Sequence, residues 1–135
     1  MADTARVALT TGDDRYTNIA RALELISDTI DLRGRQRILI KPNFVTVDRP
    51  LAATHVDAVR AVLDYLRPRT SARITIGEGA ALGDTLDGFR RYGYTDLTRT
   101  YDVELVDFNR GPWIEAPVYD TSFKDLRLRV SKTVV

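Results

Sequence analysis

Short apolar runs alternate with amphipathic stretches along the chain, and this alternation predicts its elements. Apolar residues at steps of three and four are typical of a helix that faces a core, whereas brief apolar or alternating runs between turn residues are typical of strands. The pattern predicts strands over 5–10, 37–41, 73–77, 103–107 and 125–130. It predicts helices over 16–30, from a cap at Thr54 to Pro68, over 85–92, and as one further turn over 96–101.

The order of these elements indicates the fold. Strands and helices that follow one another in turn are typical of a mostly parallel sheet covered by helices. We therefore expect an α/β fold: a three-layer, Rossmann-like, mostly parallel sheet of four to five strands with helices on both faces, formed by one domain over 1–135. Leucine or valine alternates with arginine over 125–130, which indicates an edge strand. Trp113 lies among glycine and proline, which predicts an irregular loop with the indole as its packing anchor.

Composition narrows the classes of function. The chain has 135 residues and a net charge of +1, without the concentrated basic face that a nucleic-acid partner requires. It has no cysteine and one histidine, which excludes disulfides, an iron–sulphur cluster held by this chain and a multi-histidine zinc site. No apolar run approaches the ~20 residues that span a bilayer. We therefore expect a cytoplasmic protein with no membrane partner.

The segment Lys41-Pro42-Asn43 stands where a predicted core strand ends. Ligands of open α/β sheets bind beyond the carboxyl ends of the strands, so Lys41 could hold a phosphate or carboxylate there. It could instead be a surface lysine paired with a nearby acid. Asn43 could donate to a ligand oxygen, or it could organise the turn after the proline by bonding to the backbone. This segment predicts a place for a ligand without specifying a reaction.

A second candidate segment, Gly77-Glu78-Gly79, ends the next predicted strand. The glycines permit close approach of the backbone to a ligand. The acids Glu78 and Asp84 would oppose a bare phosphate but suit a divalent metal such as magnesium, which takes oxygen ligands and bridges to phosphates. The alternative is a glycine-rich turn in which Asp84 or Thr85 caps the next helix. The spacing is not that of the dinucleotide fingerprint.

Two further residues complete the candidate set. His55 falls in the first turn of a predicted helix, where the helix dipole favours the neutral imidazole that a general base needs. Against this, a lone histidine with no identified partner is more often an ordinary residue at a helix start. Glu78 is the other candidate for moving a proton. Asp107 ends the fourth predicted strand and could orient Lys41 or a ligand hydroxyl.

Loop lengths point to the same edge of the sheet. The two strand-to-helix joins over 43–53 and 78–84 are longer than the ~2–6 residues typical of such joins. Both follow carboxyl ends of predicted strands. This concentration of chain at one edge favours a functional site there over a purely structural role.

Several of these segments also resemble a known family. The blocks at 40–45 (Ile-Lys-Pro-Asn-Phe-Val), 53–60, 76–80 (Ile-Gly-Glu-Gly-Ala), 83–85 and 103–109 together are similar to the domain of unknown function 362 family. The resemblance implies a domain about twice this long. It also implies a ferredoxin-like segment in many relatives and a basic Pro-Lys-x-Lys stretch beyond 135. Together with the apolar end at 133–135, it leads us to expect the N-terminal portion of a longer protein.

Two functions are compatible with these observations. In the first, the domain binds an anionic small molecule at the carboxyl edge of the sheet, with a divalent metal such as magnesium, as part of a larger enzyme. In the alternative, it is a structural or assembly module with no catalytic site of its own. That module would pair with a missing C-terminal half, or form a homodimer through the edge strand at 125–130 or the apolar tail.

Overall fold

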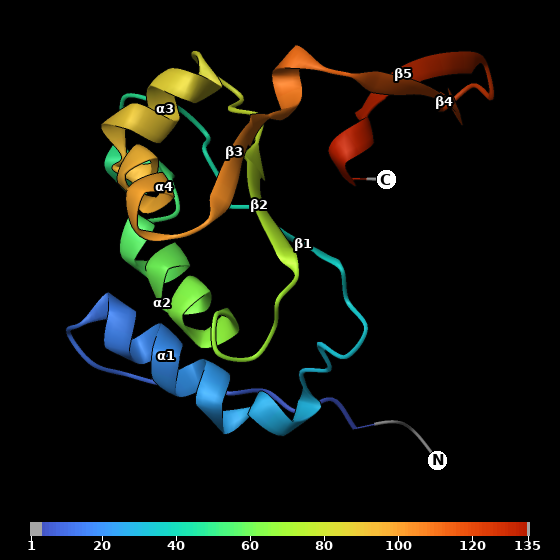
Figure 1. The fold of residues 1–135 in the computed structure, drawn as a ribbon. Helices are drawn as coiled ribbons and strands as arrows, with labels where there is room; N and C mark the ends of the chain where they lie inside the picture. The colour runs from blue at the N-terminus through green and yellow to red at the C-terminus, as the bar shows by residue number, and fades with distance from the viewer. Residues whose placement is uncertain (1–3, 135) are drawn as a thin grey trace.

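A computed structural model describes residues 4–134 and contains a parallel sheet of three strands in the order β1-β2-β3 (Figure 1). The strands are β1 (Arg37–Ile40), β2 (Arg73–Glu78) and β3 (Val103–Asp107). Helices connect them, so all three carboxyl ends lie at the same edge of the sheet. The predicted mixed α/β character and the parallel pairing of these strands are confirmed.

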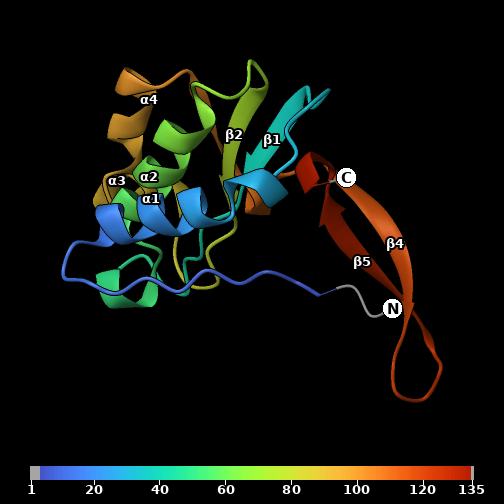
Figure 2. The ribbon, with the colours of Figure 1, turned by 90° about the horizontal axis from the view of Figure 1, so that it is seen from below.

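The helices are α1 (Arg15–Leu25), α2 (Val56–Leu66), α3 (Thr85–Arg91) and α4 (Leu97–Thr100). All four lie on one side of the sheet, and α1 is placed beside α2 (Figures 1 and 2). Within the described residues, the predicted second helical layer is therefore absent. The reason is the strand pattern: Ile74 and Ile76 face the helices, whereas Arg73 and Thr75 point to the other face. Sheets covered on both faces need strands that are apolar on both.

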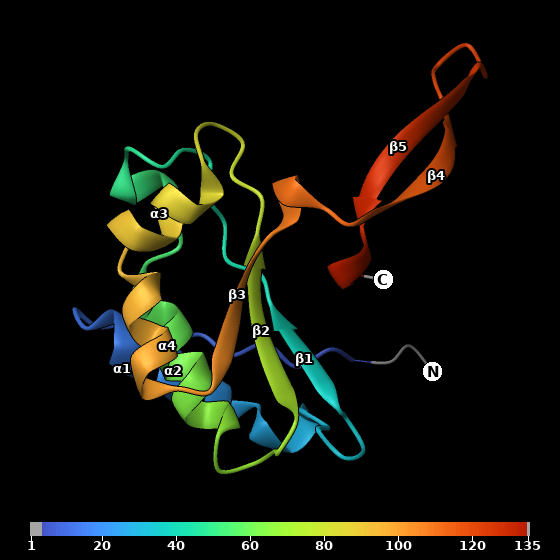
Figure 3. The same cartoon turned by 45° about the horizontal axis from the view of Figure 1, so that its top comes forward.

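The chain ends in a two-stranded antiparallel hairpin, made of β4 (Trp113–Tyr119) and β5 (Asp125–Ser131). It projects from the body on the side away from the helices (Figure 3). The prediction of an irregular loop around Trp113 was wrong. Pro117 is accommodated because both strands of a two-stranded sheet are edge strands, where a missing N–H is tolerated. The strand predicted over 125–130 is confirmed as β5, which is one residue longer, but it pairs with β4 rather than with the parallel sheet.

Two other local predictions were wrong. Residues 5–10 form no strand, and the alternating Val7 and Leu9 are exposed because no neighbouring strand pairs with them. Thr54 does not cap α2. That position belongs to His55, whose Nδ1 accepts a hydrogen bond from the Asp57 N–H at 3.2 Å. The Thr54 hydroxyl instead accepts a hydrogen bond from the Asn43 N–H at 3.0 Å.

A cluster of aromatic rings anchors the long segment that follows β1. Phe44 is 1% exposed and meets the rings of Phe89, Tyr92 and Tyr94 edge to face, with centroids 5.2 to 5.4 Å apart. Such pairs stabilise beyond the area that they bury. The Tyr94 hydroxyl donates to the Thr54 carbonyl at 2.8 Å. The segment over 43–53 is therefore held by core packing, and this packing fixes the direction of the chain as it leaves β1.

We expect Phe44→Ala to lower the free energy of unfolding by about 3–5 kcal/mol, because it leaves a cavity among three packed rings. Urea unfolding followed by circular dichroism measures this loss. Phe123→Ala is the matched control, since that ring is 87% exposed. Equal losses in the two variants would contradict the role assigned to the aromatic cluster.

Candidate functional site

The carboxyl edge of the sheet brings together side chains from three strands. Lys41 follows β1, Glu78 ends β2, and Asp107 ends β3 as the direct neighbour of Glu78 in the strand register. The Lys41 Nζ donates to Glu78 Oε2 at 2.6 Å. The lysine turn and the glycine-flanked glutamate thus lie side by side, as the parallel arrangement predicts.

The Lys41–Glu78 ion pair is asymmetric. The glutamate side chain is 4% exposed, whereas the lysine side chain is 53% exposed. A buried carboxylate is costly unless it is paired, so Lys41 compensates a charge that the core could not otherwise hold. The lysine amine also donates to the Pro42 carbonyl at 3.0 Å. The pair therefore places a positively charged, partly solvated amine at a fixed point on the edge of the sheet.

Tyr94 is a buried phenol that lies within reach of the charge of Glu78. Burial, and then the negative charge of Glu78, raises the pKa of Tyr94 above its ordinary value. The phenol therefore keeps its proton, and its O–H donates a hydrogen bond to the Thr54 carbonyl. This arrangement connects the charged edge of the sheet with the aromatic cluster around Phe44.

A cleft of about 450 Å³ opens beside the pair, and we call it the edge cleft. It is lined by Lys41, Glu78, Gly79, Phe108, Asn109, Trp113, Arg129, Val130 and Ser131. The hairpin supplies one of its walls. The Arg129 guanidinium lies 5.3 Å from the centre of the Trp113 ring, a cation–π arrangement that holds the two side chains together. The edge cleft thus contains two cations and one carboxylate.

Reasoning from the sequence missed the lining residues that the hairpin supplies, Arg129 and Trp113 above all. Arg129 has the pattern of an outward-facing residue on an edge strand, and Trp113 that of a loop anchor. Only the turn over 108–112, which carries the hairpin back to the sheet, brings both to Lys41. The alternation of arginine with apolar residues in β5 was the available signal, but it does not tell which side of the hairpin meets the sheet.

The glycines beside Glu78 make room for the segment that follows β3. A Cβ added at Gly77 would overlap the ring of Phe108, and one added at Gly79 would lie 2.8 Å from Asn109 Oδ1. Asn109 Nδ2 in turn donates to the Ala80 carbonyl at 2.9 Å. The space beside Gly77 is therefore filled by Phe108, while Gly79 lines the edge cleft.

Asp84 and Thr85 begin α3. Asp84 is its N-cap and accepts a hydrogen bond from the Asp87 N–H at 3.0 Å, while its second oxygen faces Arg110. That N–H first, and then the guanidinium, holds the pKa of Asp84 below its ordinary value. The buried Thr85 hydroxyl accepts a hydrogen bond from the Ala80 N–H at 3.1 Å. Both residues thus have the capping and turn-forming contacts of the structural alternative.

Asp107 also has partners close to it in sequence. It accepts a hydrogen bond from the Asn109 N–H at 2.8 Å and faces the Arg110 Nε at 3.1 Å. Arg110 therefore bridges Asp107 and Asp84. This bridge fixes the turn after β3 against the start of α3.

His55 and Asn43 do not line the edge cleft. The His55 Nδ1 is engaged at the start of α2, and it lies 3.4 Å from the Asp57 carboxylate. The Asn43 backbone bonds to Thr54 in both directions. Proton transfer by His55 and ligand contact by Asn43 stay predictions that depend on a surface outside this cleft.

The acids predicted to bind magnesium each face a cation. Glu78 bonds to Lys41, and Asp84 bonds to Arg110. Over residues 4–134, no group of three histidine, aspartate or glutamate side chains gathers in a metal-binding arrangement. A divalent ion at either carboxylate would have to compete with the cation already beside it.

We expect Gly77→Ala to destabilise the fold by about 1–3 kcal/mol, because the added methyl group meets the Phe108 ring in a packed site. Combining Gly77→Ala with Phe108→Ala should cost less than the sum of the two single changes, because the clash is then absent. Urea unfolding of the three variants tests this. Additive losses would show that the glycine serves something other than the packing of Phe108.

Comparison with known proteins places the chain in a family without adding a reaction. Searches against curated proteins and against solved structures give no match. Over residues 4–134, no helix has the length and apolar character needed to cross a membrane. The family described as Domain of unknown function (DUF362) matches residues 38–135, a range that includes every residue lining the edge cleft. The chain therefore belongs to this family.

Proposed function

We propose that this chain is a domain of a larger enzyme and that its edge cleft binds a small anionic molecule. The observation that carries the proposal is the meeting of Lys41, which follows β1, and Arg129, from β5, at one cleft, with Glu78 as the one carboxylate that lines it. The buried ion pair satisfies Glu78 and Lys41 together. The Arg129 guanidinium is then left to attract an anion.

The chemistry of the two cations suits a carboxylate or phosphate ligand. A guanidinium presents paired N–H donors that match either group in a bidentate manner, and an ammonium adds a compact point charge. The contact with Trp113 limits the orientations of Arg129 before the ligand arrives. A cleft volume of about 450 Å³ lies within the usual range for small-molecule sites.

Glu78 is the residue that we propose for proton transfer. Its carboxylate is buried, lies beside the edge cleft and bonds to Lys41, through which it is linked to a bound anion. A bound anion would draw the ammonium away from Glu78 and so change the balance of charge around the carboxylate. Magnesium bound together with the ligand has less support, because it would compete with Lys41 for Glu78.

We expect phosphate, citrate or phosphoglycolate to raise the melting temperature of the chain, and we expect the rise to disappear in Lys41→Gln and in Arg129→Gln. Differential scanning fluorimetry measures the rise, with and without EDTA to test the metal. Lys124→Gln and Arg127→Gln are matched controls, because both side chains lie on the hairpin but outside the edge cleft.

Loss of stabilisation in the controls as well would indicate an unspecific charge effect. A chain that unfolds on Lys41→Gln, with no anion stabilising the unaltered protein, would show that Lys41 has a structural role alone. If EDTA abolishes the rise in melting temperature, a divalent metal such as magnesium is needed for the anion to bind.

One observation favours the assembly role as a second candidate. The hairpin has one apolar face, formed by Ile114 opposite Val130, Ala116 opposite Leu128, and Val118 opposite Leu126. Leu126 and Leu128 are 45% and 54% exposed. An isolated two-stranded hairpin is marginally stable in water, so a covered apolar face would stabilise it. We propose that a second copy covers this face with its own, since a two-fold axis brings identical patches together.

Sedimentation velocity over a concentration series tests the assembly role. We expect a monomer–dimer equilibrium that Leu128→Glu shifts to monomer, because it places a charge at the centre of the apolar face. Leu51→Glu is the control, since that side chain is fully exposed and lies on a different part of the molecule. If the unaltered chain sediments as a monomer at the highest concentration, the homodimer is ruled out.

A further inference from the structure

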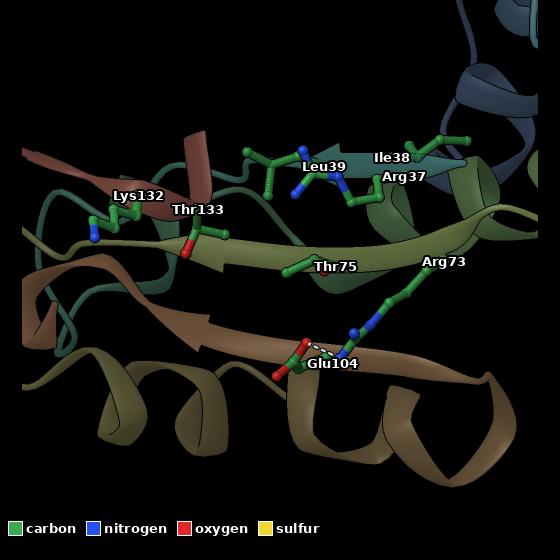
Figure 4. Close-up of a pocket in the computed structure, with 8 residues that line it drawn as sticks. All are labelled: Arg37, Ile38, Leu39, Arg73, Thr75, Glu104, Lys132 and Thr133. Atoms are coloured by element: carbon green, nitrogen blue, oxygen red, sulfur yellow. Dashed lines mark hydrogen bonds and ion pairs between the residues drawn. The ribbon is translucent and has the colours of Figure 1, made fainter. Parts of the chain in front are cut away.

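The outer face of the parallel sheet, away from the helices, carries a second cavity of about 420 Å³, which we call the sheet groove (Figure 4). It is lined by Arg37, Ile38, Leu39, Arg73, Thr75, Glu104, Lys132 and Thr133. None of these residues lines the edge cleft. The strands form the floor, and the turn over Lys132–Val134 brings Lys132 and Thr133 above it.

The charges of the sheet groove are not balanced. Arg37 and Arg73 are direct neighbours in the register of β1 and β2, where like charges repel. Glu104 on β3 neutralises Arg73 through a contact of 2.8 Å between Nη2 and Oε2. Over residues 4–134, neither Arg37 nor Lys132 forms an ion pair. Two positive charges are therefore left in excess at one concave surface.

The strand pattern shows that this face is suited to polar contacts. Outward positions of β1 and β2 carry Arg37, Leu39, Arg73 and Thr75, so an apolar residue is the exception among them. A face that packs against helices would be rich in valine, isoleucine and leucine instead. In Figure 4 the Arg37 guanidinium lies along the sheet beside Leu39, whereas Arg73 reaches across to Glu104. Arg37 is thus the cation placed over the floor of the groove.

Hydroxyl groups complete the set of donors. Thr75 projects from the central strand, and Thr133 lies above the same strand in the C-terminal turn (Figure 4). Guanidinium and hydroxyl groups around a concave site are the usual donors to phosphate and carboxylate oxygens. The groove is of small-molecule size, and its few cations do not extend into the long basic surface that nucleic acid requires.

We propose that the sheet groove is a second binding site, for a small polyanion with phosphate or carboxylate groups. Arg37 supplies the main charge-assisted contact, Lys132 adds a point charge, and Thr75 and Thr133 donate hydrogen bonds. Glu104 opposes the ligand and holds Arg73 away from it. No residue lines both the sheet groove and the edge cleft, so the two sites can be tested with separate variants.

The experiment is a titration of the ¹⁵N-labelled chain with pyrophosphate and, separately, with citrate, followed by NMR. We expect the amide signals of Leu39, Thr75 and Thr133 to move, and the curves to give an affinity for each probe. The amides of Gly79 and Asn109 report on the edge cleft in the same spectra. A preference between the two probes identifies the anionic group that the groove accepts.

Charge variants test these contacts, because loss of a cation and loss of the acid should change the affinity in opposite directions. Arg37→Gln should weaken the groove affinity by about tenfold or more, the usual effect of losing a hydrogen bond to a charged group. Arg21→Gln, on α1, removes the same charge away from the groove and should leave the affinity unchanged. Glu104→Gln should tighten binding, because it removes the opposing charge and releases Arg73.

Glu24→Gln is the control for the tightening, since Glu24 is also an exposed acid paired with an arginine, Arg69, at 3.0 Å. The proposal is overturned if neither probe moves the groove amides, or if Arg21→Gln weakens binding as much as Arg37→Gln. It is also overturned if Glu104→Gln tightens binding no more than Glu24→Gln does. Movement confined to Gly79 and Asn109 would support the edge cleft and overturn the groove.

Discussion

The ion pair between Lys41 and Glu78 is the contact on which the carboxyl edge of this domain depends. It joins the ends of two adjacent parallel strands at a point where the carboxylate is almost completely buried. An unpaired carboxylate there would be unstable, so the position of the lysine amine is determined by the needs of the core. A cation that is held for structural reasons would also be pre-organised for a ligand, and this is why we propose a binding site beside it.

The two faces of the sheet have different roles. The helix-covered face contains the core residues, and the aromatic rings around Phe44 direct the chain that leaves β1. The opposite face is polar and open, and the hairpin lies on that side (Figures 1 and 3). Gly77 matters to both faces. Because it has no side chain, the Phe108 ring can pack against it, and the segment after β3 can then turn the hairpin back toward Glu78. The packed core and the open polar face thus lie on opposite surfaces of the same short strands.

The sequence allowed prediction of what local pattern and strand polarity determine. Apolar periodicity located the parallel strands and their helices, and the shared direction of the strands implied that Lys41 and Glu78 would meet. The sequence did not allow prediction of features that depend on the path of the turns in three dimensions. The contribution of Arg129 rests on how the hairpin returns to the sheet, and proline at position 117 concealed a strand. The number of helical layers depends on the outward residues, and a strand such as Ile38-Leu39-Ile40 suggests burial on both faces until Arg37 is seen beside it.

The two faces of the hairpin carry side chains with different roles. Leu128 and Arg129 are consecutive in β5, so their side chains lie on opposite faces of one ribbon. Leu128 belongs to the apolar face, and Arg129 to the wall of the edge cleft. The two side chains share one stretch of backbone, so a molecule that orders β5 at one face acts on the strand that carries the other. If the two proposals hold, association through Leu128 and anion binding at Arg129 act on the same short strand, and any effect of one on the affinity of the other is reciprocal.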